Sequence, residues 1–397
     1  MLAFSKYTIE YAAFRVQEKD YPLKMDQLNF FQFSESVHNK GITGSISFLD
    51  YYNYSDLLPI MGGETLVITI IDIFGKKVSL EMINTSKTSN TKVDATFKNN
   101  VTLSLIQKEY YYLISRNFLY GTNYKTVNEV ISNMFTKIGL IPSKIFKDDT
   151  KTISNKTDNI AFPSFWTCDQ AISYLLDKNF TEKNNCMFFF YSKTDKKFVI
   201  YSNTDFETAE KRDVTFTFID RNSFHFVKNY HIEPHQNIVD FNNQYIGSNI
   251  MCSADTSKKK IHIKESKFDD YMTDNGIKNV GISSETNTLD SNMTYYMYSP
   301  FLYSGQQEAE LNSKRAKFLR DNFKMSISIN GRFDLNLGDK ISVIYQDNMN
   351  YVDTIQGEWI ISEILNKFQA DGQFEQVLNL SRSSISPSSK NTRIMES

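Results

Sequence analysis

Apolar and polar residues alternate with period two along much of the chain, most regularly in residues 324–384. Such alternation lets one face of an extended strand be buried while the other face contacts water. Asn330-Gly331 supplies residues that tolerate positive φ, as a tight turn between strands requires. An antiparallel meander is therefore predicted, with strands at residues 325–329, 340–345, 358–365 and 374–380.

The N-terminal part of the chain shows the same alternation. Strands are predicted at residues 30–34, 42–48, 65–72 and 78–83. Residues 93–112 predict another pair of extended segments, with Lys98-Asn99-Asn100 as the turn between them. Together these segments predict one all-β domain.

The hydrophobic period then changes to that of a helix. Thr126 and Glu129 match a capping box, and apolar residues recur at spacings of three and four up to Ile138. A second helix is predicted at residues 167–179, followed by a hairpin within residues 186–201. The combination predicts a small α+β domain.

The rest of the chain returns to extended patterns. Strands are predicted at residues 213–219 and 238–245, and a helix at residues 306–322. The predicted fold class is α+β and mainly β, with two tube-like antiparallel β-barrel or sandwich domains plus smaller α+β domains. The predicted division is a first tube-like β domain at 1–120, a small α+β domain at 121–210, a second tube-like β domain at 211–245 and 320–384, an inserted peripheral domain at 246–319, and a flexible tail at 385–397.

Composition agrees with several packed domains. A chain of 397 residues exceeds the size at which one hydrophobic core stops growing, and its 31 Phe and 23 Tyr suit twisted sheets. A formal net charge of −2 lacks the basic signature of a dedicated nucleic-acid binder. Three widely spaced cysteines indicate a reducing compartment, and no apolar run predicts membrane insertion.

Candidate metal chemistry is weak. His231 and His235 have the spacing of helical metal ligands and flank Glu233, but Pro234 breaks such a helix. A solvated or interface loop is the better interpretation. The other two histidines considered, His225 and His262, lie in strand-like polar segments and need no partner. We therefore expect no metal and no cofactor.

Candidate catalytic groups are also weak, and we expect no enzyme. The acid pairs at residues 148–149 and 269–270 are adjacent in sequence, so neither pair predicts the facing carboxylates of a glycosidase. No nucleophile elbow or phosphate-binding glycine loop is present in the sequence. The lysines at 258–260 and Lys264 could contact phosphate, but acids beside them indicate a solvated surface.

One internal similarity stands out. Residues 62–70 match residues 337–345 in pattern, because Gly62, Gly63 and Glu64 open one strand as Gly338 and Asp339 open the other. Gly357 then marks the turn into the next strand of the second copy. Chance likeness between two generic hairpins explains the sequence pattern equally well. A true duplication would let three chains present six copies of one β unit.

On these residues the sequence resembles the central baseplate hub protein of contractile-tailed phages of the T-even type, which is similar to the hub portion of type VI secretion spike proteins. The resemblance covers essentially the whole chain in order. Its motifs are residues 41–70 with Asp50, Leu57, Leu58, Pro59, Ile60, Gly63 and Glu64, then residues 162–166, 333–341 and 359–364. Related hubs often carry a histidine where this chain has Asn366, so the role of that position is open.

The resemblance implies a structural virion protein. It implies a homotrimeric ring that docks the tail tube on one side and the spike's oligosaccharide-binding-fold domain on the other. The ring would meet other baseplate components, adapt sixfold to threefold symmetry, and leave a channel through which DNA passes without specific binding. Such a protein is assembled in the host cytoplasm and resides in the tail baseplate.

Alternative functions remain open at this point. A tail-associated cell-wall hydrolase would need a convergent acid pair or a nucleophile with its base. A receptor-binding tail protein would need an exposed aromatic platform. The sequence offers one candidate set of interface aromatics, although core packing explains it nearly as well: Tyr295, Tyr296, Tyr298, Phe301 and Tyr303.

Overall fold

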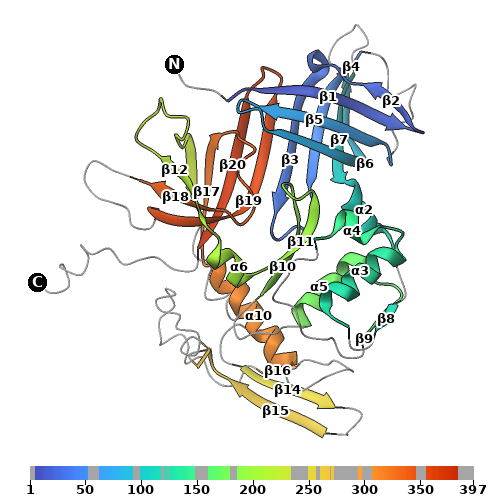
Figure 1. Cartoon of the computed structure of the whole chain (residues 1–397), viewed down its shortest axis with the longest axis vertical. Helices are drawn as coiled ribbons and strands as arrows, with labels where there is room; N and C mark the ends of the chain where they lie inside the picture. The colour runs from blue at the N-terminus through green and yellow to red at the C-terminus, as the bar shows by residue number, and fades with distance from the viewer. Residues whose placement is uncertain are drawn as a thin grey trace, which may run out of the picture.

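The structure is a computed structural model (Figure 1). It describes residues 5–51, 62–92, 99–117, 120–122, 125–147, 160–178, 186–233, 249–255, 260–268, 270–271, 294–296, 306–345 and 355–382. Most strands belong to one large sheet, and the helices gather beside and below it (Figure 1). The predicted mainly β fold class is confirmed.

Two groups of six strands build the large sheet. The first β unit contains β1 (Tyr7–Val16), β3 (Leu28–Ser36), β4 (Thr43–Asp50), β5 (Thr65–Asp72), β6 (Lys77–Lys92) and β7 (Asn99–Gln107). The second β unit contains β12 (Lys211–Thr217), β13 (Asn229–Ile232), β17 (Phe323–Asn330), β18 (Lys340–Ile344), β19 (Gly357–Gln369) and β20 (Phe374–Arg382). The short β2 (Lys19–Pro22) and 3-10 helix η1 (Met25–Gln27) join β1 to β3.

Both units have the same strand order. The first runs β3-β4-β7-β6-β5-β1 across the sheet, and the second runs β13-β17-β20-β19-β18-β12. In each unit, the strands taken in chain order therefore occupy the same six places. One difference is the direction of the first strand, because β1 is antiparallel to β5 whereas β12 is parallel to β18.

Alternating side chains explain why these segments form strands. In β5, Leu66, Ile68 and Ile70 are buried while the residues between them are partly exposed. In β17, Met325 and Ile327 are buried in the same alternating manner. Each strand therefore places an apolar row in the core of its unit.

A helical region lies beside the units and contains α2 (Lys108–Ser115), β8 (Tyr120–Thr122), α3 (Val127–Lys137), α4 (Pro142–Ile145), β9 (Ile160–Phe162), α5 (Cys168–Lys178), β10 (Met187–Ser192), β11 (Lys197–Ser202) and α6 (Asn203–Thr208). The predicted capping box of α3 is confirmed, since Thr126 N–H donates to Glu129 and Glu129 N–H donates to Thr126 Oγ1.

The hairpin β10–β11 has two buried faces. Phe188 packs in the second unit's core, whereas Phe189 packs against the helices.

A three-stranded sheet forms the lower end of the molecule, built from β15 (Lys260–Ser266), β14 (Asn249–Asp255) and β16 (Thr294–Tyr296) in that order (Figure 1). Helix α10 (Gln306–Arg320) leads from this end to β17. Among the described residues, no helix is long and apolar enough to cross a bilayer.

The prediction for residues 93–112 was wrong in part. Lys108–Ser115 is the helix α2, and Asn99 with Asn100 begins β7 rather than forming a turn. Tertiary packing favours the helix over a strand. Leu113 is buried against the other helices. Tyr110 packs over Gly41, where a side chain on residue 41 would collide with the tyrosine ring. Residues 93–98 and the predicted strand at 238–245 lie outside the described residues.

The predicted domain boundaries stay predictions. The boundary at 319/320 falls inside α10, and the boundary at 120/121 falls inside β8. Cores are also shared across the predicted borders: Ala316 of α10 packs with the second unit, and Leu113 of α2 packs with the helical region. The predicted tail at 385–397 lies outside the described residues.

Candidate functional site

The repeated turn has the same backbone hydrogen bonds in both units. In the first unit, Gly63 N–H donates to Asn84 O at 2.8 Å, and Asn84 N–H donates to Glu64 O at 2.8 Å. In the second unit, Gly338 N–H donates to Ile361 O at 2.9 Å, and Ile361 N–H donates to Asp339 O at 3.0 Å. Gly63 is thus equivalent to Gly338, and Glu64 to Asp339.

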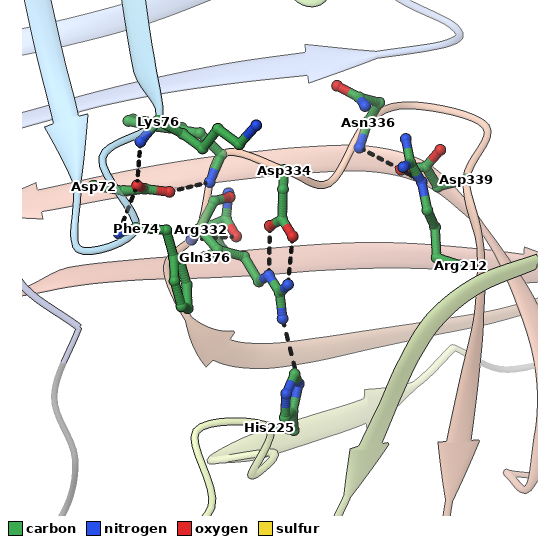
Figure 2. A network of polar contacts seen from close by, with 11 residues as sticks. Asp72, Phe74, Lys76, Arg212, His225, Arg332, Asp334, Asn336, Asp339 and Gln376 are labelled. Carbon is green, nitrogen blue, oxygen red and sulfur yellow. Dashed lines mark hydrogen bonds and ion pairs between the residues drawn. The ribbon is translucent and has the colours of Figure 1, made fainter.

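The acid of each turn also holds the chain before it. Glu64 accepts a hydrogen bond from Gly62 N–H at 3.2 Å and one from Asn84 Nδ2 at 2.9 Å. Asp339 accepts one from Asn336 N–H at 2.9 Å and pairs with Arg212 at 3.0 Å (Figure 2). Burial raises the pKa of Asp339, while the Asn336 N–H and Arg212 oppose that shift.

A β-bulge repeats directly after the turn. Pairing of β6 with β7 shifts register between Asn84 and Ser86, and pairing of β19 with β20 shifts between Ile361 and Glu363. The residue inside each bulge donates its hydroxyl to the partner strand. Thr85 Oγ1 donates to Ser104 O of β7 at 3.2 Å, and Ser362 Oγ donates to Asn379 O of β20 at 2.8 Å. A bulge with its own hydroxyl bond at equivalent places is unlike two generic hairpins.

Glycine is required in these turns because of the backbone conformation and, at Gly338, also because of a neighbouring ring. Gly62, Gly63, Gly338 and Gly357 have φ values of +119°, +95°, +84° and +127°, in the region that side chains disfavour. At Gly338, a Cβ would in addition stand 2.6 Å from the ring of Phe206. Nothing lies within 4 Å of the equivalent position at Gly63.

The two units meet at a junction formed by β3 and β19. These strands pair antiparallel from Ser36↔Glu363 to Phe30↔Gln369. The end of the β19–β20 hairpin then reaches the start of β1, where Phe374 N–H donates to Ser5 O at 2.8 Å. Three aromatic residues of the second unit enter the first unit's core: Phe333, Phe368 and Phe374.

Asp72 joins the units through its side chain. It is 5% exposed at the end of β5, and its Oδ1 accepts hydrogen bonds from Phe74 and Lys76 N–H, both at 2.9 Å. Its Oδ2 accepts the N–H of Phe333, which belongs to the second unit, at 2.8 Å (Figure 2). One buried carboxylate therefore holds both its own hairpin and the neighbouring unit.

Arg332 lies beside this contact and ties several second-unit segments together. Its guanidinium pairs with Asp334 through two nitrogens, and a third nitrogen lies 3.3 Å from His225 Nδ1 (Figure 2). Its backbone is held by Gln376, which accepts from Arg332 N–H at 3.0 Å and donates to Arg332 O at 2.7 Å. The guanidinium also lies over the ring of Phe74 from the first unit, at 5.5 Å.

The expectation that His225 needs no partner was wrong. His225 lies in the loop between β12 and β13, where Thr217 N–H donates to its carbonyl and its ring contacts Arg332. Burial lowers the pKa of His225, and the positive charge of Arg332 lowers it further. The ring is therefore held in its neutral form over more of the pH range than a free histidine.

Asn366 lies at the centre of the junction. It is fully buried on β19, and its Oδ1 accepts a hydrogen bond from Gln376 Nε2 at 2.7 Å. Its Nδ2 has no hydrogen-bond partner among the described residues. Asn366 is thus a core residue of the junction, in contact with the side chain that also holds the backbone of Arg332.

Most of the other candidate residues lie outside the part of the chain that the structure describes. Tyr295 and Tyr296 lie in β16, while Tyr298, Phe301 and Tyr303 lie outside the described residues. His231 is exposed on β13 rather than in a loop, and His235 lies outside the described residues. Asp148, Asp149 and Asp269 also lie outside them. Within the described residues, no group of three or more His, Cys, Asp or Glu side chains could hold a metal ion.

The junction residues were missed in the sequence. Asp72 carried a usable local signal, because an Asp at the end of a strand and before Phe74-Gly75 is typical of a turn whose side chain accepts backbone N–H groups. Arg332, Asp334 and Gln376 carried no such signal, since the contacts that define them link distant segments.

Comparisons with known proteins support the fold and leave the sequence family open. No protein-family model and no curated protein sequence matches the chain. A tail protein from Neisseria meningitidis MC58 has a similar structure, with a TM-score of 0.62 and 11% identity over 96% of this chain and 98% of that one. The 43 kDa tail protein of prophage MuSo2 from Shewanella oneidensis gives a TM-score of 0.60 and 12% identity over 94% and 98%.

A chain of a two-protein complex shares the fold as well. In a Francisella PdpA-VgrG complex, the matching chain gives a TM-score of 0.54 and 11% identity over 97% of this chain. The match spans 59% of that longer chain. These similarities confirm the fold that the resemblance implied: the chain has the architecture of these two tail proteins and of a chain in the PdpA-VgrG complex.

Proposed function

We propose that this protein is a structural subunit of a phage tail baseplate, the central hub that joins a sixfold tail tube to a threefold spike. The observation that carries the proposal is the duplication within one chain. Both units share the strand order, the glycine-acid turn and the bulge that follows it. Three chains around an axis then present six equivalent β units.

The junction supports this role because it makes the two units one body. A symmetry adaptor has to hold its two units in fixed relation, or six sites would not form one ring. The β3–β19 pairing, the buried Asp72 carboxylate and the shared aromatic core provide that rigidity. The predicted domain division belongs to this proposal, with the two β units forming the ring wall and the other regions lying outside it.

The remaining partners follow from the same proposal. The tail tube docks on one side of the ring, the spike's oligosaccharide-binding-fold domain on the other, and further baseplate components around them. The similarity to tail proteins and to VgrG supports this assignment at the level of the fold. The protein is assembled in the host cytoplasm and resides in the virion baseplate.

The proposed work is mechanical, with no catalysis. A central passage would carry DNA, and the net charge of −2 suits a conduit, because a strongly basic wall would retain DNA through counterion release. DNA binding should therefore be weak and insensitive to salt. The alternative of a cell-wall hydrolase predicts that the purified protein releases soluble fragments from peptidoglycan, and such release would contradict the structural role.

The main test is the mass and symmetry of the purified full-length protein. Mass photometry should give a particle of about 138 kDa, three times the 46.1 kDa chain. Low-resolution images along its axis should show six similar densities around a central hole. A persistent monomer in the presence of its spike partner, or a ring whose number of densities is not six, would overturn the proposal.

A further inference from the structure

The lower sheet ends in an open strand edge. Strand β15 pairs antiparallel with β14, from Lys260↔Asp255 to Ser266↔Asn249, and β16 lies on the other side of β14. In the part of the chain that the structure describes, β15 has no second neighbour. Its outer edge therefore offers a row of backbone donors and acceptors, which is the feature to which another strand can be added.

The same strand exposes two large apolar side chains. Ile261 is 75% exposed and Ile263 is 69% exposed, and their two-residue spacing places them on one face of β15. The register sets Ile263 opposite Cys252, and Cys252 opposite Tyr296. In backbone register, the open edge is therefore two strands away from one of the aromatic positions that the sequence indicated as an interface.

Lysines also alternate with the isoleucines along this strand. β15 contains Lys260 and Lys264 and one acid, Glu265, a formal charge of +1. Lys260 within β15 is exposed. A partner segment that carries acidic residues would be attracted to this edge, and its charges would discriminate against basic competitors.

Charge argues against a second copy of this chain as the partner. Two copies of β15 could pair antiparallel so that Ile261 of each copy faces Ile263 of the other. The same register places Lys260 of each copy opposite Lys264 of the other. It also places the two copies of His262 opposite each other. Like charges directly opposite each other destabilise a strand pair. The exposed isoleucines argue against nucleic acid, since phosphate contacts need the lysines and gain nothing from apolar side chains.

We propose that β15 is a docking edge for another protein, which adds an extended segment with alternating apolar and acidic residues. Its apolar side chains cover Ile261 and Ile263, its acidic ones lie near the lysines, and its backbone bonds to the free edge. This surface lies at the far end of α10 from the β units, so the inference does not depend on the hub proposal (Figure 1).

The test is a selection of random octapeptides displayed on yeast against the full-length protein, with counter-selection on the Ile261→Asp/Ile263→Asp variant. Both side chains are exposed, so the variant should fold normally, as circular dichroism would verify. Ile141→Asp is the matched control, because Ile141 is 54% exposed elsewhere on the surface. Selected peptides should alternate apolar residues with Asp or Glu.

Binding of the best peptide then measures each part of the proposal. The double isoleucine variant should bind at least about tenfold more weakly, because two apolar contacts are lost. Lys260→Glu should weaken binding, and Ile141→Asp should leave it unchanged. N-methylation of alternate peptide amides should abolish binding in one register and spare it in the other, as main-chain pairing requires.

Several outcomes would overturn the inference. The selection could enrich no peptide above the background of the counter-selection, or it could enrich basic peptides. The best peptide could also bind the wild type and the double isoleucine variant equally well. A change of oligomeric state in that variant would assign the edge to a second copy of the chain. Binding of duplex DNA that Lys260→Glu removes and the isoleucine substitutions leave intact would assign it to nucleic acid.

Discussion

The two β units share their turn, bulge and strand order, and they differ in their first strand and in the elements that complete their cores. The turn, the bulge and the order of the six strands are the same in both. The first strand runs antiparallel to its neighbour in one unit and parallel in the other. The elements that complete each core also differ, since three phenylalanines of the second unit enter the first, while hairpin β10–β11 and helix α6 cover the second.

This difference separates what local bonding specifies from what the surrounding chain decides. The shared features are held by hydrogen bonds between neighbouring strands, so each copy can form them independently. The differing features depend on where the chain enters and on what packs against the core. Neither unit has a complete core without a contribution from outside, which favours one rigid body over two separable domains.

The equivalent glycines give the largest test of this comparison. Gly338→Ala should destabilise the protein by about 2 to 5 kcal/mol, because it adds both backbone strain and a collision with Phe206. Gly63→Ala should cost only about 1 to 2 kcal/mol, since its φ is also positive but no atom lies close. Guanidinium unfolding midpoints measure both. Equal losses would mean that the packing around the second turn contributes nothing.

Asp72 tests the junction rather than either unit. Asp72→Ala leaves three backbone N–H groups without their acceptor, one of them on Phe333, and should cost about 2 to 3 kcal/mol. Asp371→Ala is the control, because Asp371 is exposed and accepts a single N–H from Gln373. Hydrogen exchange should speed up at Phe333 in the first variant alone. A loss no larger than that of the control would contradict the role assigned to Asp72.

The two bulge hydroxyls offer a smaller test. Ser362 is 8% exposed and Thr85 is exposed, although their hydroxyls make equivalent bonds. Ser362→Ala should cost about 1 kcal/mol, and Thr85→Ala a few tenths, because water replaces the bond at the exposed site. Thermal unfolding of both variants in the same buffer checks the ranking. The reverse order would show that burial is not what separates the two bulges.

The sequence predicted the parts of the fold that are local. Alternation located most strands, and the Gly-Gly-Glu and Gly-Asp segments identified the repeated turn, because turn chemistry and side-chain period are visible within a few residues. Helix α2 was missed because its tyrosines favour strands in isolation, while burial of Leu113 decides the outcome. The bulge left no signal, since Thr85 and Ser362 are ordinary strand residues.

The junction could not be predicted, for a physical reason. Asp72 and Phe333 are 261 positions apart, and their bond exists only after both units have folded and docked. Arg332 and His225 are 107 positions apart, and their contact forms only after the second unit has folded. A single sequence carries the preference of each residue for a local conformation but no trace of which distant backbone group it will meet.

His225 gives the mildest test, and it concerns the second unit alone. Its pKa is lowered in the folded protein by burial and by Arg332, so the unfolded chain takes up a proton first as the pH falls. The contribution of the neutral ring to the free energy of unfolding is complete above about pH 6.5 and is lost as the pH falls below that value.

Thermal midpoints measured from about pH 8 to about pH 5 should therefore decline below about pH 6.5 in the wild type and decline less in His225→Gln. Exposed His231 on the neighbouring strand provides the control, because His231→Gln should keep the wild-type slope. The carboxylates are the same in all three proteins, so their contribution cancels when the slopes are compared. Parallel slopes in all three proteins would show that the contact between His225 and Arg332 does not respond to protonation.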